Sequence, residues 1–292
     1  MSIWTKIVSF ILAMFGLVAS VPAQSQTPVP ENAETYDLTV MSYNVYVVGT
    51  GSRSPENRSA GVLNNIRNVM PDVFGLQEAD YDWMQRIIDG MPEYSYVGRG
   101  RGKGETNGEY SPVFYKSEKY DLVDSGTFWF SDTPDKSSLS WGTAFRRICS
   151  WAVLEDKATG FTFGVFNSHW DHTSHISRNN SAKLLLRKIE EYAPDMPVVI
   201  TGDFNCKANT VAYSLLVDAG FVDSMYVAAD TTDIGTYHGY TKTDTEGELP
   251  IDHILLKDAY GFAHSYRVIT DRFDGQYPSD HFPIVSEMTM YK

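Results

Sequence analysis

The order of strand-like and helix-like segments predicts an α/β fold, a four-layer α/β sandwich in which two mixed, mostly antiparallel β-sheets pack face to face with helices outside. Apolar strands alternate with helices towards both ends of the chain, and four strands follow one another without a helix between residues 111 and 170. No Pro-, Gly- or Ser-rich linker interrupts residues 37–292, so we predict one domain over that range.

The first 36 residues precede the predicted domain. Lys6 stands before an uncharged apolar run at residues 7–21, which is short for a membrane span and typical of a signal peptide. We assign residues 1–23 to a signal peptide cut after Ala23, with an uncleaved membrane anchor as the alternative. Residues 24–36 are polar with two prolines and predict a flexible tether. We therefore expect a secreted or periplasmic protein without a stable membrane span once the signal is removed.

The first part of the domain predicts two strand–helix pairs. Residues 38–45 alternate apolar and polar side chains, as a strand does. Ser54 is suited to cap a helix and Pro55 to occupy its first position, and the helix runs to about Met70. A second strand and a second helix follow at residues 72–78 and 81–90.

The rest of the domain continues with the antiparallel run and further alternating elements. Helices are predicted at residues 177–193, where Ser177 is the candidate cap, and at residues 210–220, where Gly220 ends the helix. Strands are predicted at residues 111–116, 121–131, 146–156, 161–170, 197–205, 250–257, around Arg267 and at 282–290.

Composition limits the partners that the protein is suited to bind. A net charge of −13 does not attract a long polyanion such as nucleic acid, although it leaves room for a small phosphate ester held by a metal. Export permits disulfides, but Cys149 and Cys206 lie in segments that we expect not to be neighbours, so two free, buried thiols are predicted. We expect a monomer.

Polar and acidic residues recur at the ends of apolar strands, where active sites are built. A charged side chain at such a place is costly unless it is paired or binds a metal, and turns alone do not explain several of them in one domain. The strand-end residues are Asn44, Glu78, His169, Asp171, Asp203, Asn205, Asp252, His253, Ser279, Asp280 and His281.

Their chemistry indicates a hydrolytic site. Glu78 and Asn44 offer the hard oxygen ligands that Mg²⁺ prefers, and no Cys–His spacing suggests zinc. Asp203 and Asn205 are two residues apart, so on an extended segment they face the same side. His281 needs a carboxylate to fix its tautomer, and Asp252 is the candidate. His253 follows Asp252 directly and so points to the opposite face, and we leave it out of the site.

The ordered set of these residues resembles the endonuclease/exonuclease/phosphatase superfamily, and the resemblance spans nearly all of residues 37–292. It implies a metal site of Glu78, Asn44 and Asp280, with Mg²⁺ as the cofactor and Mn²⁺ as a substitute. It also implies that Asp203 activates or orients the attacking water. The further implied catalytic residues are Asn205 and His169 at the phosphate, and Asp252 orienting His281, which contacts the scissile phosphate.

Four further residues are candidates for substrate binding: Arg147, Glu109, Asp171 and His238. Arg146 or Arg147 stands at a strand start, where one of the two is expected to contact phosphate, and Glu109 lies near the end of a glycine- and charge-rich stretch at residues 98–110. That stretch is either a mobile surface loop or a substrate loop in which Arg99, Arg101 or Lys103 reaches phosphate. His172, in a polar loop, is expected to be solvated.

We therefore predict a secreted, Mg²⁺-dependent phosphoesterase that hydrolyses a phosphate mono- or diester by in-line attack of water. An extracellular endo- or exonuclease is the alternative, which the charge does not favour. A binding protein that kept the fold and lost the chemistry is a second alternative. No expected ligand is missing from the sequence, which argues against that reading.

Overall fold

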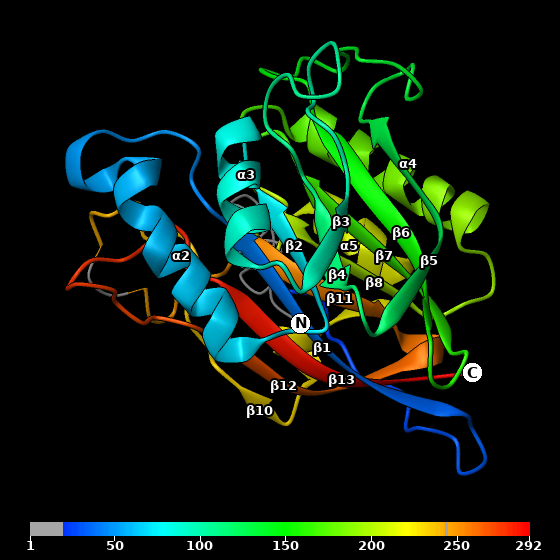
Figure 1. Cartoon of the computed structure of the whole chain (residues 1–292). Coiled ribbons are helices and arrows are strands. Elements are labelled where there is room, and N and C mark those ends of the chain that lie inside the picture. The colour runs from blue at the N-terminus through cyan, green and yellow to red at the C-terminus, as the bar shows by residue number, and fades with distance from the viewer. Residues whose placement is uncertain (1–19, 243–244) are drawn as a thin grey trace, which may run out of the picture.

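The computed structural model describes residues 20–242 and 245–292 and has the four layers that the sequence predicts (Figure 1). Most of the predicted signal peptide, residues 1–19, lies outside the described residues. Within the described ranges, none of the helices combines the length and the apolar character that a membrane crossing requires.

The first sheet has seven strands in the order β10-β12-β13-β1-β2-β4-β3. β1 pairs in parallel with β2 and antiparallel with β13, so strands from both ends of the chain meet at the centre of this sheet. The strands are β1 (Thr35–Asn44), β2 (Val73–Gln77), β3 (Tyr94–Val97), β4 (Val113–Lys116), β10 (Asp230–Thr231), β12 (Gly261–Val268) and β13 (Ile284–Tyr291).

The second sheet has six strands in the order β5-β6-β7-β8-β11-β9. Three of the four strands of the predicted antiparallel run belong here, whereas β4 pairs in the first sheet, so the run crosses from one sheet to the other. The strands are β5 (Tyr120–Trp129), β6 (Ile148–Asp156), β7 (Thr162–His169), β8 (Val198–Asp203), β9 (Phe221–Asp223) and β11 (Asp252–Lys257).

Apolar clusters fill the three spaces between the four layers. One lies between the sheets, one under α2 and α3 on the first sheet, and one under α4 and α5 on the second. Cys149 and Cys206 are free and buried in the last of these, as predicted. The helices and 3-10 turns are η1 (Gly51–Arg53), α2 (Pro55–Val69), α3 (Tyr81–Gly90), α4 (His175–Tyr192), α5 (Val211–Asp218), α6 (Ser224–Val227) and η2 (Asp258–Tyr260).

Two predicted helix starts have different outcomes. Ser54 caps α2 as predicted, because its side chain accepts a hydrogen bond from the backbone N–H of Asn57 and Pro55 is the first helical residue. For α4 the predicted cap was wrong. Ser174 caps this helix by accepting from the N–H of Ser177, so the helix begins at His175, before the predicted start.

A buried polar bridge joins the two sheets below the strand ends. The Asn167 Oδ1 atom of β7 accepts hydrogen bonds from Gln77 Nε2 at 2.7 Å and from Thr201 Oγ1 at 3.0 Å. This approach requires glycine at position 75, because a Cβ there would lie 2.4 Å from the Asn167 side chain. The two sheets are therefore held in one fixed relation near the edge where the polar residues gather.

The segment predicted as a tether makes specific contacts with the domain. Gln26 Nε2 donates to the carbonyl oxygens of Val227 and Ala263 at 3.0 Å, and its Oε1 accepts from the N–H of Ala263 at 2.8 Å. Thr27 donates twice to Asp258, with both distances at 2.7 Å. Since Gln24 also binds the domain, residues 24–27 lie docked on its surface, in contrast to the flexible tether predicted for residues 24–36. Strand β1 also begins at Thr35, within that predicted tether.

Candidate active site

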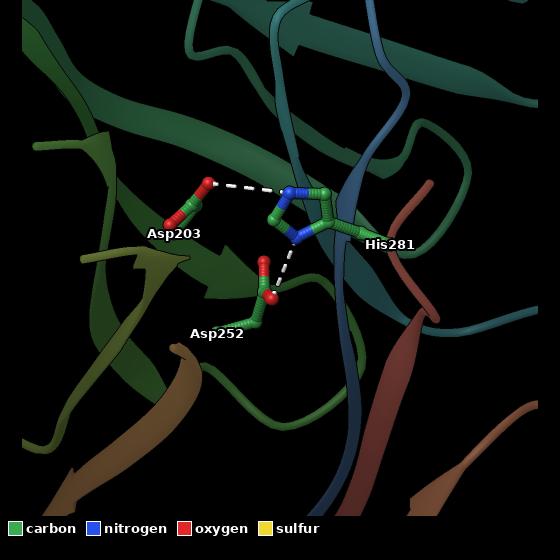
Figure 2. A group of neighbouring side chains, drawn as sticks. All are labelled: Asp203, Asp252 and His281. Carbon is green, nitrogen blue, oxygen red and sulfur yellow. Dashed lines mark hydrogen bonds and ion pairs between the residues drawn. The ribbon is translucent and has the colours of Figure 1, made fainter. Parts of the chain in front are cut away.

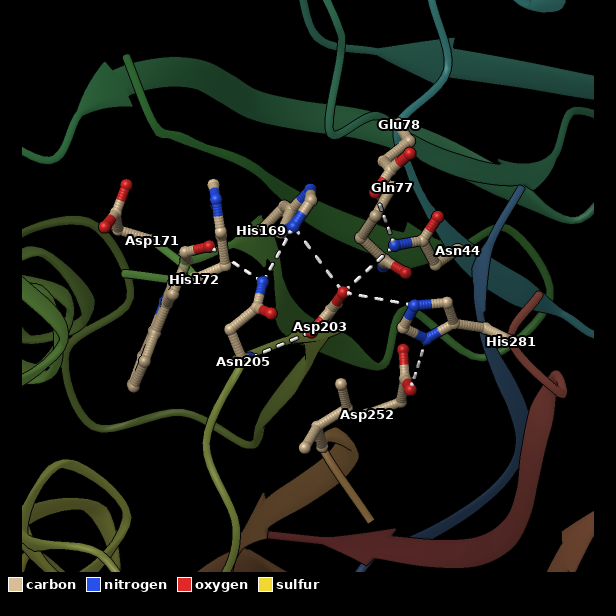
Figure 3. A network of polar contacts seen from close by, with 12 residues as sticks. Asn44, Gln77, Glu78, His169, Asp171, His172, Asp203, Asn205, Asp252 and His281 are labelled. Carbon is tan, nitrogen blue, oxygen red and sulfur yellow. Dashed lines mark hydrogen bonds and ion pairs between the residues drawn. The ribbon is translucent and has the colours of Figure 1, made fainter. Parts of the chain in front are cut away.

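Strand pairing brings the polar strand ends together at one edge of the sandwich (Figure 3). In the second sheet His169 pairs with Asp203 across the parallel β7–β8 ladder, and Asp252 lies opposite Asp203 across the antiparallel β8–β11 ladder. In the first sheet Asn44 pairs with Gln77 at the ends of β1 and β2. Because both sheets end here, residues far apart in sequence surround one space.

Asp203 is the centre of this polar network. Its Oδ2 accepts a hydrogen bond from Asn44 Nδ2 at 3.0 Å, and its Oδ1 accepts one from the N–H of Asn205 at 2.8 Å. The Nε2 atoms of His169 and His281 lie 3.5 and 3.8 Å from the same Oδ2. Burial, together with the negative charge of Asp252, raises the pKa of Asp203 to about 7. This carboxylate is therefore suited to accept a proton near neutral pH.

Asn205 fixes the orientation of His169. The Asn205 side-chain nitrogen donates to the carbonyl oxygen of Trp170 at 3.1 Å and to Nε2 of His169 at 2.9 Å. His169 then carries its proton on Nδ1 and is neutral, in agreement with burial and the Arg147 charge, which lower its pKa well below the usual value. Asn205 has a φ of 48°, a left-handed conformation that asparagine tolerates better than most residues.

His281 forms a buried pair with Asp252, as the sequence predicts. The His281 Nδ1 atom lies 2.8 Å from Asp252 Oδ2, and the Thr236 hydroxyl donates to the same oxygen at 2.6 Å. Burial alone lowers the pKa of His281, but the charges of Asp252 and Asp203 outweigh it and raise the value to about 10. His281 is therefore an imidazolium whose Nε2–H faces Asp203.

The Asp203, Asp252 and His281 cluster has ligand atoms within 4.8 Å of one another, a spacing that also suits a metal ion (Figure 2). The ring of His281 lies between the two carboxylates, with one nitrogen directed to each. A protonated ring has no free lone pair for a metal. We therefore assign this cluster to proton transfer and charge stabilisation.

Glu78 and Asp280 supply the donor set that fits a divalent cation. Both carboxylates line the same cavity, and Asp280 Oδ1 is buried with no hydrogen-bond partner in residues 20–242 and 245–292. Burial raises the pKa of Asp280 to about 6, and the charge of Glu78 adds to the rise against the opposing effect of His281. Two close carboxylates with an unpaired oxygen call for a cation, and oxygen donors suit Mg²⁺.

Glu78 itself is held in an uncommon conformation. Its φ is 61°, and its carboxylate accepts from the N–H of Val47 at 3.0 Å and from Asn44 Nδ2 at 3.2 Å. Left-handed backbone at a residue other than glycine costs free energy and is often retained at functional sites. Asn44, fully buried behind Glu78 and Asp203, thus orients both carboxylates and lies outside the cavity wall.

A cavity of about 410 Å³ opens over this network. Arg147 lines it with a side chain that is 4% exposed; its Nε lies 3.9 Å from Asp171 Oδ2, and its Nη1 has no hydrogen-bond partner among the described residues. The other guanidinium nitrogen of Arg147 lies 3.2 Å from His172 Nδ1. A buried cation with free N–H groups in a cavity is suited to bind an anionic oxygen.

The predicted substrate-binding residues divide into two groups. Arg147 and Glu109 line the cavity, whereas Asp171 and His238 are fully buried outside its wall. Asp171 accepts hydrogen bonds from the backbone N–H groups of Thr173 and Ser174 and so shapes the loop after β7. His238 stacks on Phe282, with ring centroids 4.4 Å apart. For these two residues the structure does not support substrate contact.

Several cavity residues were missing from the predicted site. His172 is exposed, as expected, and it also lines the cavity beside Arg147. Tyr237 lies beside His281, next to the predicted His238. Arg101 lines the cavity, in agreement with the substrate-loop alternative for residues 98–110, and no sequence pattern indicated Phe145.

Comparison with known proteins agrees with this geometry. The model of the "Endonuclease/Exonuclease/phosphatase family" matches residues 41–281. An endonuclease/exonuclease/phosphatase from Bacteroides vulgatus is 31% identical, with a TM-score of 0.82 over 87% of this chain and 98% of that one. A mannosyl-6-phosphatase from Bacteroides thetaiotaomicron is 32% identical, with a TM-score of 0.82 over 86% of this chain and 99% of that one.

A more distant relative carries a nuclease name. The CCR4-Not complex 3'-5'-exoribonuclease subunit Ccr4 of Emericella nidulans is 23% identical over 273 residues. The match covers 69% of this chain and 40% of that protein's length. The fold, the strand-end network and the family match over most of the domain lead to one conclusion: the chain belongs to the endonuclease/exonuclease/phosphatase family and is a metal-dependent hydrolase of phosphate esters.

Proposed function

We propose that the protein is an exported, Mg²⁺-dependent phosphatase that acts as a monomer on the phosphate monoester of a small polyhydroxylated molecule such as a sugar. The observation that carries this proposal is Arg147, a buried cation whose Nη1 atom has no partner among the described residues and which lines the same cavity as the Glu78 and Asp280 carboxylates and the His281 imidazolium. A terminal phosphate carries more negative charge than a diester, and this cavity holds positive groups on more than one side. The similarity to the mannosyl-6-phosphatase supports the same substrate class.

The residues of this chain divide the hydrolysis between them. Asp203 accepts a proton from the attacking water as the new bond from oxygen to phosphorus forms. His281, held by Asp252 at 2.8 Å, donates its Nε2–H to a phosphoryl or leaving oxygen as the bond from phosphorus to the leaving oxygen breaks. Asn205 holds the His169 ring at 2.9 Å beside Asp203, so the Nδ1–H of His169, which has no partner among the described residues, can donate to the phosphate.

Glu78 and Asp280 would hold the cation, with Asn44 orienting Glu78 from behind. Bound Mg²⁺ offsets the negative charge that develops on the phosphoryl oxygens. Because these donors are oxygens, Mn²⁺ is expected to substitute and softer metals to bind less well.

A substrate panel tests the activity. The purified protein is assayed for phosphate release from a hexose 6-phosphate and phenyl phosphate, and for cleavage of a bis-aryl phosphodiester and single-stranded nucleic acid, with Mg²⁺, with Mn²⁺ and with chelator. We expect hydrolysis of the monoesters that depends on the metal, and loss of most of it in Arg147→Met. Preferred cleavage of nucleic acid would favour the nuclease alternative, and no metal-dependent turnover of any ester would favour a binding protein.

Export has its own test. The proposed signal peptide predicts that protein recovered from the medium or periplasm begins at Gln24, which N-terminal sequencing and intact mass would detect. A mass that retains residues 1–23 in a membrane fraction would support the anchor alternative. Light scattering on the purified protein tests the monomer.

A further inference from the structure

Exposed aromatic side chains gather at the catalytic cavity. Among the described residues, the exposed aromatic side chains are Tyr81, Tyr96, Phe145 and Tyr237, and the last two line this cavity. Phe145 is 50% exposed and Tyr237 is 44% exposed. Large apolar surface left open to water at a cavity usually serves a ligand.

Phe145 stands among cationic and aromatic neighbours that hold it in place. Its ring stacks on His172 with centroids 5.9 Å apart. The guanidinium carbon atoms of Arg101 and Arg147 lie 5.0 and 5.9 Å from its centroid. Arg147 is the proposed phosphate-binding residue, so Phe145 and Arg101 lie directly beside the place where the phosphate binds.

Arg101 and Glu109 form an ion pair in the same wall. Arg101 Nη2 lies 2.6 Å from Glu109 Oε1, and both side chains are largely buried. Burial raises the pKa of the Glu109 carboxyl and lowers that of the Arg101 guanidinium, so both groups have lost much of their hydration. A buried ion pair adds little net stability, because desolvation offsets the attraction between the charges. Its place in the cavity wall therefore indicates a role in binding.

The loop that carries this pair is fixed by its own backbone contacts. The N–H of Arg101 donates to the carbonyl of Glu109 at 2.9 Å, and the N–H of Gly102 donates to the carbonyl of Asn107 at 2.7 Å. The indole N–H of Trp129 donates to the carbonyl of Arg101 at 2.8 Å. The pair is thus positioned before any ligand arrives, which lowers the entropic cost of binding.

We propose that Arg101, Glu109 and Phe145 form a carbohydrate subsite that binds the sugar ring carrying the phosphate, and this inference rests on the proposed phosphatase function. The carboxylate accepts a hydrogen bond from one ring hydroxyl while the guanidinium donates to its neighbour, so the side-by-side pair matches a vicinal diol. The exposed ring of Phe145 packs against the C–H face of the sugar.

The test compares kcat/KM for three monoesters: a hexose 6-phosphate, phenyl phosphate and a 5′-mononucleotide. In Glu109→Gln the ratio of kcat/KM for hexose phosphate to that for phenyl phosphate should fall at least ~10-fold, because a hydrogen bond to a charged group is lost. Phe145→Leu should raise KM for hexose phosphate by about threefold to tenfold. Glu105→Gln is the matched control, because Glu105 lies in the same loop, is 74% exposed and pairs with Arg99 outside the cavity wall.

Each other outcome overturns a distinct statement. If Glu109→Gln changes kcat/KM equally for hexose and phenyl phosphate, or if Glu105→Gln has the same effect, the subsite is wrong while the phosphatase function stands. A preference for the mononucleotide that Phe145→Leu abolishes would assign the ring to a nucleobase. No metal-dependent turnover of any of the three esters by the wild-type protein would overturn the proposed function and the subsite together.

Discussion

Strand β11 carries two buried Asp–His pairs, one on each of its faces. Asp252 pairs with His281 on the face towards the catalytic cavity. The next residue, His253, points to the other face, where its Nδ1 lies 2.7 Å from Asp223 and its Nε2 lies 3.0 Å from the carbonyl oxygen of Cys206. Both histidines are at most 5% exposed, and both have raised pKa values.

The difference between the pairs lies in what surrounds the second ring nitrogen. In His281 that nitrogen faces Asp203 in the cavity, whereas in His253 it contacts the backbone carbonyl oxygen of Cys206. The ring of Phe204 also stacks on His253, with centroids 5.2 Å apart. The Asp223–His253 pair, here called the enclosed pair, holds the loop that follows β8. The Asp252–His281 pair, here called the open pair, can exchange a proton with a ligand. A short Asp–His distance and a raised pKa do not by themselves identify a catalytic pair; access to the cavity does.

Removal of His281, the histidine of the open pair, should have the largest effect on activity. His281→Asn deletes the proposed proton donor, so kcat on a phosphate monoester should fall by about 10²- to 10⁴-fold. Steady-state kinetics measured below the melting temperature checks this. A variant that folds, by circular dichroism, and retains more than about a tenth of wild-type kcat would show that His281 is not in the reaction.

The carboxylates of the two pairs, Asp252 and Asp223, offer the next comparison. Asp252→Asn removes the charge that keeps His281 protonated, so kcat should fall by about 10²-fold or more. Asp223→Asn changes the matching carboxylate of the enclosed pair and should lower stability with a much smaller effect on kcat. Equal losses of kcat in both variants, each measured well below its melting temperature, would contradict the separation of the two pairs.

The enclosed histidine should matter chiefly for stability. His253→Gln leaves Asp223 buried without its charged partner, which should cost about 3–5 kcal/mol of unfolding free energy. Urea unfolding measures this cost, and kcat at low temperature is expected to stay within a few-fold of wild type. A 100-fold loss of kcat with unchanged unfolding would reverse the assignment.

Comparison of wild type with His253→Gln also tests how the unfolding free energy depends on pH. Burial lowers the pKa of His253, but the hydrogen bond and charge of Asp223 outweigh it, so the folded value lies above the ordinary 6.5. Because the pKa of His253 is higher in the folded protein than in the unfolded chain, its charge stabilises the fold. This stabilisation is complete below the pKa of the unfolded chain and is lost as pH rises through the pKa of the folded protein. The difference in unfolding free energy between wild type and His253→Gln should therefore shrink as pH rises from about 6 upward. A difference that grows over this range would contradict the charged pair.

The smallest effect is expected at the N-terminal segment, where Gln24 contacts Asp223 of the Asp223–His253 pair. Gln24 Oε1 accepts from the N–H of Asp223 at 2.7 Å, and its Nε2 donates to Tyr213 at 2.9 Å. Gln24→Ala should cost about 1–2 kcal/mol of unfolding free energy and leave kcat at the wild-type level. Ser25→Ala is the neighbouring control, because the Ser25 side chain makes no hydrogen bond within the described part of the chain.

Much of the site followed from strand periodicity. Asn44, Glu78, Asp203 and Asp252 interrupt apolar runs at strand ends, and the two-residue period of a strand placed His253 on the face opposite Asp252. The four-layer fold followed from the order of strands and helices in the same way. These predictions depend on local pattern, which a single sequence contains.

The places of other residues, which strand periodicity did not predict, depend on where loops converge. Arg101 reaches the cavity because Trp129, from another segment, fixes the carbonyl of its loop. Asp171 has the spacing of a site residue, yet the N–H groups of its own loop satisfy its carboxylate. No periodicity reports such tertiary contacts, and the same holds for the docked Gln24 and Gln26.

The docked N-terminal segment has a consequence for the timing of folding. Its hydrogen-bond partners lie up to 237 residues away in sequence, on β12. Synthesis proceeds from the N-terminus, so residues 24–27 are made before the strands of the domain but can only reach their final contacts after nearly the whole domain exists. These contacts can therefore form only late in synthesis, as can the pairing of β1 with β13.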